Sequence, residues 1–177
     1  MKSVRQYYVK YFNGFSLKGE ERLFDAYLLD SDFCVAGFSY GAQQALEYTY
    51  HTTERIDRLI LLSPAFFQTQ KPSFIRAQLR YFKTDKDAYV SQFLKNVSYP
   101  STYDLDTYVD VGSAEALESL LSYTWEAKKI ETILSRGTVI EVFMGAKDKI
   151  VDTEEARKFF TQTTNYILKD AGHLLKD

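Results

Sequence analysis

The sequence has 177 residues, of which 45% are apolar and 16% aromatic, and its formal net charge is -2. A chain of this length forms one domain and buries about 70% of the surface that it exposes when unfolded. The high apolar fraction and the single cysteine, Cys34, exclude a disordered, collagen-like or disulfide-stapled chain. The small net charge argues against nucleic acid as a partner.

No apolar run approaches the roughly 18 residues that a membrane-spanning helix requires. Residues 1–7 also lack the apolar stretch and the cleavage site of a secretory leader. A lone cysteine is typical of a reducing compartment. We therefore expect a soluble cytoplasmic protein that does not associate with membranes.

Clusters of β-branched and aromatic residues predict five strands, over residues 5–12, 32–37, 58–63, 138–144 and 165–169. Helical periodicity predicts helices over residues 20–29, 40–50, 126–135 and 154–160. Strands that alternate with helices indicate an α/β fold, with a mostly parallel sheet and flanking helices.

The segment between the third and fourth predicted strands is far too long for an ordinary crossover. It contains all three prolines of the chain, yet its apolar residues keep helical spacing. We therefore predict a core of residues 1–63 and 137–177. Residues 64–136 then form an inserted helical cap and the core helix that follows it.

The motif Gly37-Phe38-Ser39-Tyr40-Gly41 lies between a predicted strand and a predicted helix. This is the G-x-S-x-G pattern of a nucleophile elbow, a strained turn that exposes the serine hydroxyl. The two glycines remove Cβ atoms that would collide in so tight a turn. The Tyr40 N–H then points at a reacting carbonyl from the positive end of the helix. The alternative is a glycine-tight joint with a capping serine.

An acid and a base follow the elbow in the order Ser39, Asp148, His173, which is the order of hydrolases with this elbow. Both follow predicted strands, and catalytic groups gather at the carboxyl ends of parallel strands. The second histidine, His51, lies roughly 18 Å along the helix from Ser39 and cannot reach it. Taken alone, His173 would be a frayed tail residue. Asp152 is the reserve acid, although its position before a predicted helix favours an N-cap.

The loop Asn13-Gly14-Phe15 follows the first predicted strand and offers a second donor to a negative oxygen. Gly14 lets the backbone approach a substrate, and the Phe15 N–H would join that of Tyr40. An Asn-Gly turn that binds nothing is the alternative. Five of the eight glycines fall in the loops of this predicted site: Gly14, Gly37, Gly41, Gly145 and Gly172.

The insertion carries charge of opposite sign in its two halves. Residues 71–95 hold six lysines and arginines against two aspartates, whereas residues 100–126 hold six acidic residues and no Lys or Arg. Arg76, Arg80 and Lys83 share one helix face. That face is either simply solvated or a docking patch for an acidic partner.

These motifs resemble the α/β-hydrolase superfamily over nearly the whole chain. More narrowly, segments 11–15, 61–64, 76–82 and 141–145 are similar to the short bacterial type of pimeloyl-acyl-carrier-protein methyl ester esterase of biotin synthesis. The resemblance implies a minimal α/β-hydrolase fold. The first two strands and the fourth strand of the full family sheet are missing from one edge, and about five strands remain. Asn13 replaces the His that many relatives have there, which is expected to change the support of the loop.

The resemblance implies that Ser39 is the nucleophile, His173 the base and Asp148 its orienting acid, with Phe15 and Tyr40 as oxyanion donors. It implies a serine carboxylic ester hydrolase without metal or cofactor. The substrate would be the methyl ester of pimeloyl-acyl carrier protein, and methanol would be one product. The alternatives are a general short-acyl esterase or thioesterase, and a non-catalytic module that binds the carrier protein.

Two groups of cap residues complete the predicted site. Arg76 and Arg80 match cap-helix arginines that, in longer relatives, contact the acidic acyl carrier protein or its phosphopantetheine arm. Lys83 joins them on charge alone. The aromatic residues expected to line an acyl channel, or otherwise only to pack the cap, are Tyr81, Phe82 and Trp125.

Overall fold

The computed structural model describes residues 9–177, and its strands form one sheet that is parallel throughout, in the order β1-β2-β3-β4-β5. The expected sheet of five strands is confirmed, and apart from the start of the first strand each strand end lies within two residues of its predicted position. Residues 5–8 of the first predicted strand, and the leader argument on residues 1–7, lie outside the described residues. The strands are β1 (Lys10–Phe12), β2 (Cys34–Phe38), β3 (Arg58–Leu62), β4 (Val139–Gly145) and β5 (Thr164–Leu168).

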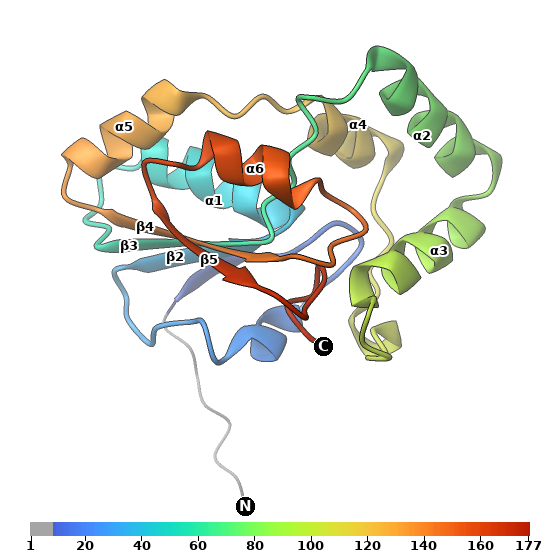
Figure 1. The fold of residues 1–177 in the computed structure, drawn as a ribbon, viewed down its shortest axis with the longest axis horizontal. Coiled ribbons are helices and arrows are strands. Elements are labelled where there is room, and N and C mark those ends of the chain that lie inside the picture. The colour runs from blue at the N-terminus through green and yellow to red at the C-terminus, as the bar shows by residue number, and fades with distance from the viewer. Residues whose placement is uncertain (1–8) are drawn as a thin grey trace, which may run out of the picture.

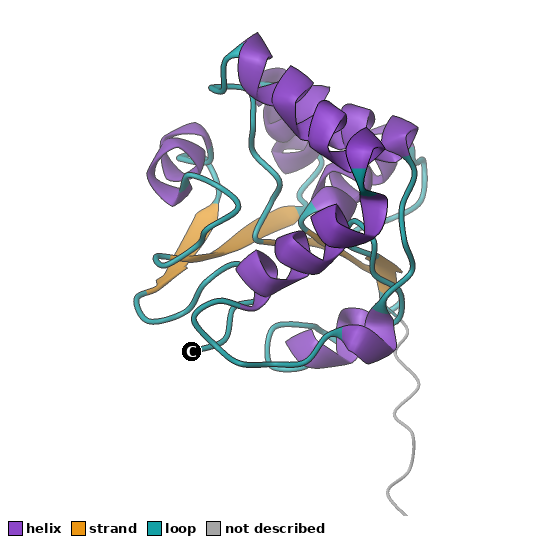
Figure 2. Ribbon diagram, turned by 90° about the vertical axis from the view of Figure 1, so that its right-hand side faces the viewer, coloured by secondary structure: helices purple, strands orange, loops and turns teal. Residues whose placement is uncertain are grey.

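Figure 1 shows α1, α5 and α6 on one face of the sheet, while α2 and α3 lie beyond the end to which the β5 arrow points. Seen from that end, helices lie in front of the sheet (Figure 2). The helices are α1 (Tyr40–His51), α2 (Pro72–Thr84), α3 (Lys86–Ser98), α4 (Ala114–Ser122), α5 (Ala127–Ser135) and α6 (Thr153–Phe159), with two 3₁₀ turns, η1 (Glu20–Phe24) and η2 (Asp106–Tyr108). Among residues 9–177, no helix is long and apolar enough to cross a membrane.

The central strands β2 and β3 are buried almost throughout, as their continuous apolar sequences require in a parallel sheet. Strand β4 alternates instead, with Ile140, Val142 and Met144 buried and the positions between them partly exposed. Phe143 stacks on Tyr166 of β5. The alternation shows that one face of β4 is packed more completely than the other.

The predicted helix over residues 20–29 is wrong, because only the short 3₁₀ turn η1 forms there. Polar groups of this segment bond to the C-terminal segment. The Leu23 carbonyl accepts a hydrogen bond from Lys176 Nζ at 3.0 Å, and the Tyr27 hydroxyl donates to the Leu175 carbonyl at 3.4 Å. In an α-helix the Leu23 carbonyl would accept from the Tyr27 N–H. Here it accepts from Lys176 instead, and the Tyr27 N–H donates to the Phe24 carbonyl at 2.8 Å.

The predicted insertion is helical, and we call α2, α3, α4 and the segments that join them the cap. The helix that follows, α5, is tied to the core, because Lys129 forms a 2.8 Å ion pair with Glu47 of α1. The division of the chain into a core of residues 1–63 and 137–177 and an insertion of residues 64–136 stays a prediction.

The burial of β3 and the exposure of the first residue of β4 predict that truncation of a side chain destabilises the two positions to different extents. Leu61 is fully buried, so Leu61→Ala should lower the free energy of unfolding by about 2–5 kcal/mol. Val139 is 42% exposed, and Val139→Ala should change it by less than about 0.5 kcal/mol. Urea denaturation measures both, and equal losses would contradict this placement of the core.

Candidate active site

Ser39 occupies the turn between β2 and α1 with φ 56° and ψ -110°. A positive φ is costly for a residue other than glycine, and neighbouring backbone must hold it. The Ser39 N–H donates to the Leu62 carbonyl at 2.9 Å, and the Ser39 carbonyl accepts from Ala42 and Ala65 at 3.1 and 3.2 Å. The turn is the strained elbow that the motif predicts.

Both glycines of the motif are required by close backbone contacts. A Cβ on Gly37 would collide with the Gly41 carbonyl, and a Cβ on Gly41 would collide with the Phe12 carbonyl. The second contact brings the end of β1 against the elbow. The loop that follows β1 therefore lies beside Ser39.

Three side chains from separate loops form a hydrogen-bonded chain, which we call the triad. His173 Nε2 lies 2.8 Å from Ser39 Oγ, and His173 Nδ1 lies 2.6 Å from Asp148 Oδ2. Asp148 Oδ1 accepts from the N–H groups of Ile150 and Val151 at 2.7 and 2.9 Å, which leaves Oδ2 facing the histidine. An ionised carboxylate only accepts, so Nδ1 carries the proton and Nε2 can take the proton of the serine.

The other candidate groups have different partners. The reserve acid Asp152 caps α6 by accepting from the Glu155 N–H at 3.1 Å. His51 is exposed, and its Nε2 lies 3.3 Å from Glu47 Oε2. Burial raises the pKa of the Cys34 thiol to about 11, so this cysteine is a neutral thiol at physiological pH. Among the described residues, no cluster of His, Cys, Asp and Glu could hold a metal ion.

His173 is fully buried and is not part of a frayed tail. The Ser63 hydroxyl donates to the His173 carbonyl at 2.6 Å, and the next residue, Leu174, donates its N–H to the Val97 carbonyl of α3 at 3.1 Å. Sequence reasoning missed Ser63. The one signal for it was a polar residue directly after the apolar strand β3, which is too common a pattern to single out.

Phe15 and Tyr40, the expected oxyanion donors, line the same small cavity of about 260 Å³. Tyr40 is the first residue of α1, where the N–H has no intrahelical partner. Among residues 9–177, neither of these two N–H groups has a hydrogen-bond acceptor. Both are therefore available to a substrate.

Glu20 supports this loop and was not recognised from the sequence, where it fell in a predicted helix. Its side chain is fully buried, and Oε1 accepts from the Gly14 N–H at 2.7 Å and from the Tyr11 hydroxyl at 3.0 Å. Burial raises the pKa of the Glu20 carboxyl, although the Gly14 N–H lowers it in part. The substituted Asn13 accepts from the Gly19 N–H at 3.1 Å and closes the same loop.

Neither a family model nor a curated protein matches this chain. Among solved structures, an alpha/beta hydrolase fold protein from Burkholderia ambifaria is similar with a TM-score of 0.62 and 15% identity, over 96% of this chain and 85% of that one. This chain has an α/β-hydrolase fold.

Two further solved structures are similar over less of their own length. They are an esterase from Exiguobacterium antarcticum (TM-score 0.53, 16% identity, 79% of this chain and 59% of that chain) and a hydrolase from Oleispira antarctica (TM-score 0.61, 13% identity, 80% of this chain and 58% of that chain). At these identities the likeness is one of fold.

A cavity of about 800 Å³ lies between the cap of this α/β-hydrolase fold and the loop after β4. Asp148 lies on its wall, so the cavity adjoins the triad. Tyr81 lines it, as expected, but Phe82 does not. The Phe82 ring is buried against Phe15 and Tyr89, so its role is to pack the cap. Apolar side chains that line the cavity include Phe67, Phe74, Tyr81, Phe93, Leu120 and Val151.

Trp125 also packs and does not line this cavity. It is buried against Tyr123 and Phe160, and its indole N–H donates to the Ala65 carbonyl at 2.8 Å. For Phe82 and Trp125, the alternative of aromatic packing is therefore the better description.

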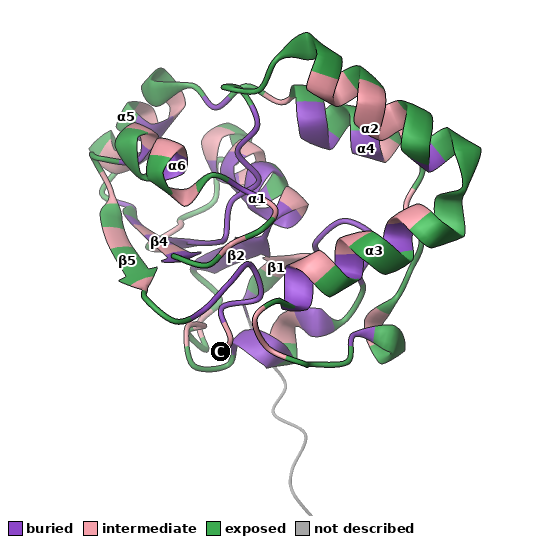
Figure 3. Cartoon of the chain, turned by 45° about the vertical axis from the view of Figure 1, so that its right-hand side comes forward, coloured by how far each residue is buried: buried purple, intermediate pink, exposed green. Residues whose placement is uncertain are grey.

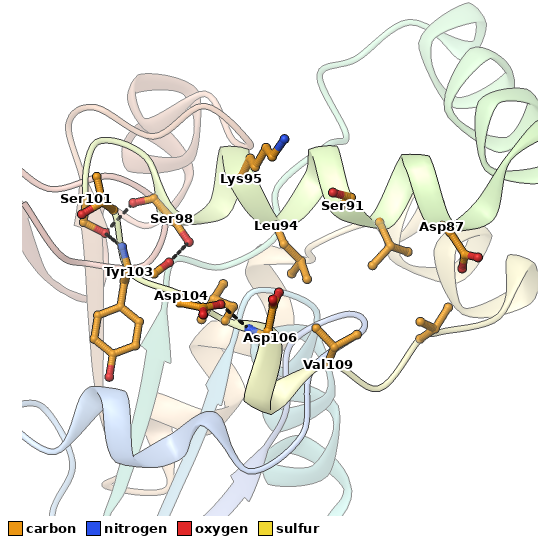
Figure 4. Close-up of a pocket in the computed structure, with 14 residues that line it drawn as sticks. Asp87, Ser91, Leu94, Lys95, Ser98, Ser101, Tyr103, Asp104, Asp106 and Val109 are labelled. Carbon is orange, nitrogen blue, oxygen red and sulfur yellow. Dashed lines mark hydrogen bonds between the residues drawn. The ribbon is translucent and has the colours of Figure 1, made fainter.

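A separate cleft of about 490 Å³ lies between α3 and the segment that follows it (Figure 4). Its polar groups bond largely to one another. The Ser98 hydroxyl donates to the Tyr103 carbonyl, the Ser101 hydroxyl donates to the Ser98 carbonyl, and the Asp106 N–H donates to Asp104. No triad residue lines this cleft.

Arg76, Arg80 and Lys83 lie together on the exposed side of α2, along a shallow cleft of about 440 Å³. Figure 3 shows α2 largely exposed on its outer side. The pKa of Glu115 on α4 is lowered by hydrogen bonds at the start of that helix and, to a smaller extent, by the charges of Lys83 and Lys86. The lysine charge is thus partly balanced within the cap.

The two aspartates of the β4–α6 region predict different effects on the reactivity of Ser39. Asp148→Asn should slow labelling of Ser39 by a fluorophosphonate probe by roughly 10⁴-fold, because His173 loses the carboxylate that sets its tautomer. Asp152→Asn is the matched control and should label at the rate of the parent protein, because asparagine also caps a helix. Equal slowing in both variants would rule out this assignment of the acid.

Proposed function

We propose that the protein is a serine carboxylesterase, and the triad geometry is the observation that carries this proposal. Ser39 Oγ, His173 and Asp148 Oδ2 form one chain of hydrogen bonds of 2.8 and 2.6 Å. A serine next to a histidine that a carboxylate orients is the arrangement of an activated nucleophile. The Exiguobacterium protein of similar fold is itself described as an esterase.

In the proposed reaction, His173 takes the Ser39 proton as Oγ attacks the ester carbonyl. The negative oxygen of the tetrahedral intermediate accepts from the N–H groups of Phe15 and Tyr40, each of which would lower the barrier by about 3–4 kcal/mol. His173 then gives its proton to the leaving alcohol. Water, activated by the same histidine, hydrolyses the acyl-enzyme and regenerates Ser39.

We further propose that the physiological substrate is the methyl ester of pimeloyl-acyl carrier protein in the cytoplasm. Hydrolysis gives pimeloyl-acyl carrier protein and methanol in biotin biosynthesis. The sequence resemblance supports this choice, and so does the largely apolar cavity of about 800 Å³ beside Asp148. Thr84 lies on the wall of this cavity and also beside the Arg76 and Arg80 cleft, so the basic face adjoins the cavity.

The proposed reaction predicts that the protein restores growth of a biotin auxotroph that lacks its methyl ester esterase. Ser39→Ala should abolish the rescue, because it removes the nucleophile while leaving the fold in place. Growth without biotin and mass spectrometry of the carrier-linked product measure the outcome. Rescue by Ser39→Ala would refute an enzymatic role and favour a carrier-binding module.

Reversal of the charge on the outer side of α2 should act only on carrier-linked substrates. Arg76→Glu with Arg80→Glu should raise KM for the methyl ester of pimeloyl-acyl carrier protein, because a negative face repels an acidic partner. KM for a small soluble ester should not change. Lys128→Glu with Lys158→Glu, on the exposed sides of α5 and α6, makes the same change of net charge and is the control.

Steady-state kinetics on the two substrates test whether this face of α2 binds the acyl carrier protein. Equal losses on both substrates would exclude docking through this face. Equal turnover of free short esters and carrier-linked esters by the parent protein would indicate a general short-acyl esterase or thioesterase.

A further inference from the structure

The carboxylate of Glu20 is an unusual group to find in the interior of the protein. It is fully buried, and no cation lies among its hydrogen-bond partners in residues 9–177. Its Oε1 accepts from the Gly14 N–H and the Tyr11 hydroxyl, whereas Oε2 is buried without a hydrogen-bond partner. A buried carboxyl without a cation reduces stability, so its presence calls for a reason other than packing.

The Gly14 N–H that Glu20 holds belongs to the peptide directly before the one that carries the Phe15 N–H. The second peptide is held on its carbonyl side, because Leu17 donates its N–H to the Gly14 carbonyl at 3.1 Å. Together the two hydrogen bonds fix the peptide planes on both sides of the Gly14 Cα. Glycine is otherwise the residue most free to rotate there. The direction of the Phe15 N–H therefore depends on both hydrogen bonds, one of which Glu20 accepts.

The residue after Phe15 is held from the cap. The Ser16 carbonyl accepts from the Asp110 N–H at 2.9 Å, and the Ser16 hydroxyl accepts from the Gly112 N–H at 3.0 Å. The Phe15 ring itself packs against the Phe93 ring of α3. Phe15 thus lies between one anchor inside the core and another in the cap. Replacing Glu20 removes the anchor in the core and leaves the hydrogen bonds between Ser16 and the cap in place.

We propose that Glu20 is a positioning residue for the oxyanion loop, because its buried carboxylate holds the Gly14 N–H and so directs the Phe15 N–H at the reacting carbonyl. This role rests on the esterase function proposed above. Glu20 touches neither the substrate nor the triad, and its effect on the reaction passes entirely through the Gly14 and Phe15 backbone. An oxyanion donor that points away from the carbonyl oxygen stabilises the intermediate much less.

The test compares kcat and KM of three variants on an activated soluble ester. Each rate is divided by the concentration of active sites, which is measured by titration of Ser39 with a fluorophosphonate. Glu20→Met keeps the length of the side chain and removes the acceptor, and it should lower kcat by about 10- to 100-fold with KM changed by less than about threefold. Glu20→Gln keeps an oxygen for the Gly14 N–H and should retain kcat within about threefold. Glu21→Ala removes the adjacent carboxylate of η1 and should match the parent protein.

A merely structural role makes a different prediction. It would reduce the number of titratable sites or the thermal stability, while kcat per titrated site stayed unchanged. An unchanged kcat per titrated site in Glu20→Met would overturn the proposal. It would also be overturned if Glu20→Met failed to fold while Glu20→Gln folded with the kcat of the parent protein. A loss in Glu20→Gln as large as that in Glu20→Met would show that an oxygen acceptor for the Gly14 N–H does not sustain kcat, and would overturn the proposal as well.

Failure of the esterase function has a separate signature. If the parent protein hydrolyses no ester, the rate at which the fluorophosphonate labels Ser39 still reports on the oxyanion loop, because the phosphoryl oxygen needs the same donors. A slower rate in Glu20→Met than in Glu21→Ala would then support the positioning role alone. Equal labelling rates in these two variants would overturn it.

Discussion

The site depends on one backbone contact, in which Gly41 at the start of α1 lies directly against the Phe12 carbonyl at the end of β1. Two main chains can approach so closely only where no side chain separates them. The contact places the loop that carries Phe15 next to the turn that carries Ser39. The proposed nucleophile and the proposed donors to its tetrahedral intermediate are therefore neighbours before any substrate binds, which is the preorganisation that the proposed acyl transfer requires.

The parallel sheet extends this arrangement to the acid and the base. Because all the strands run in one direction, the loops after β1, β2, β4 and β5 reach the same edge of the sheet. The cap then fixes two of these loops. Phe15 packs on Phe93, and Val97 accepts a hydrogen bond from the residue after His173. The cap is thus part of the support of the site as well as a wall of its cavity.

Much of the fold and of the site follows from local patterns. Apolar strands, the elbow motif and the capping position of Asp152 involve residues that are close in the chain, so their spacing predicts them. Elements held by distant partners were missed or misread. The predicted helix over residues 20–29 is replaced by η1, where the Leu23 carbonyl bonds to Lys176 and the Tyr27 N–H bonds to the Phe24 carbonyl. Phe82 does not line the cavity, because its ring is buried against the rings of Phe15 and Tyr89.

The amino-acid sequence by itself determined the order of the strands, the strained turn at Ser39 and the choice of His173 over His51, because each of these follows from spacing along the chain. Only the tertiary structure decided which carboxylate reaches His173, where the cavity lies, and that Glu20 and Ser63 hold the loops of the site. Those contacts join residues from different elements. Their distances are set by how the sheet, the loops and the cap pack together, which no local pattern records.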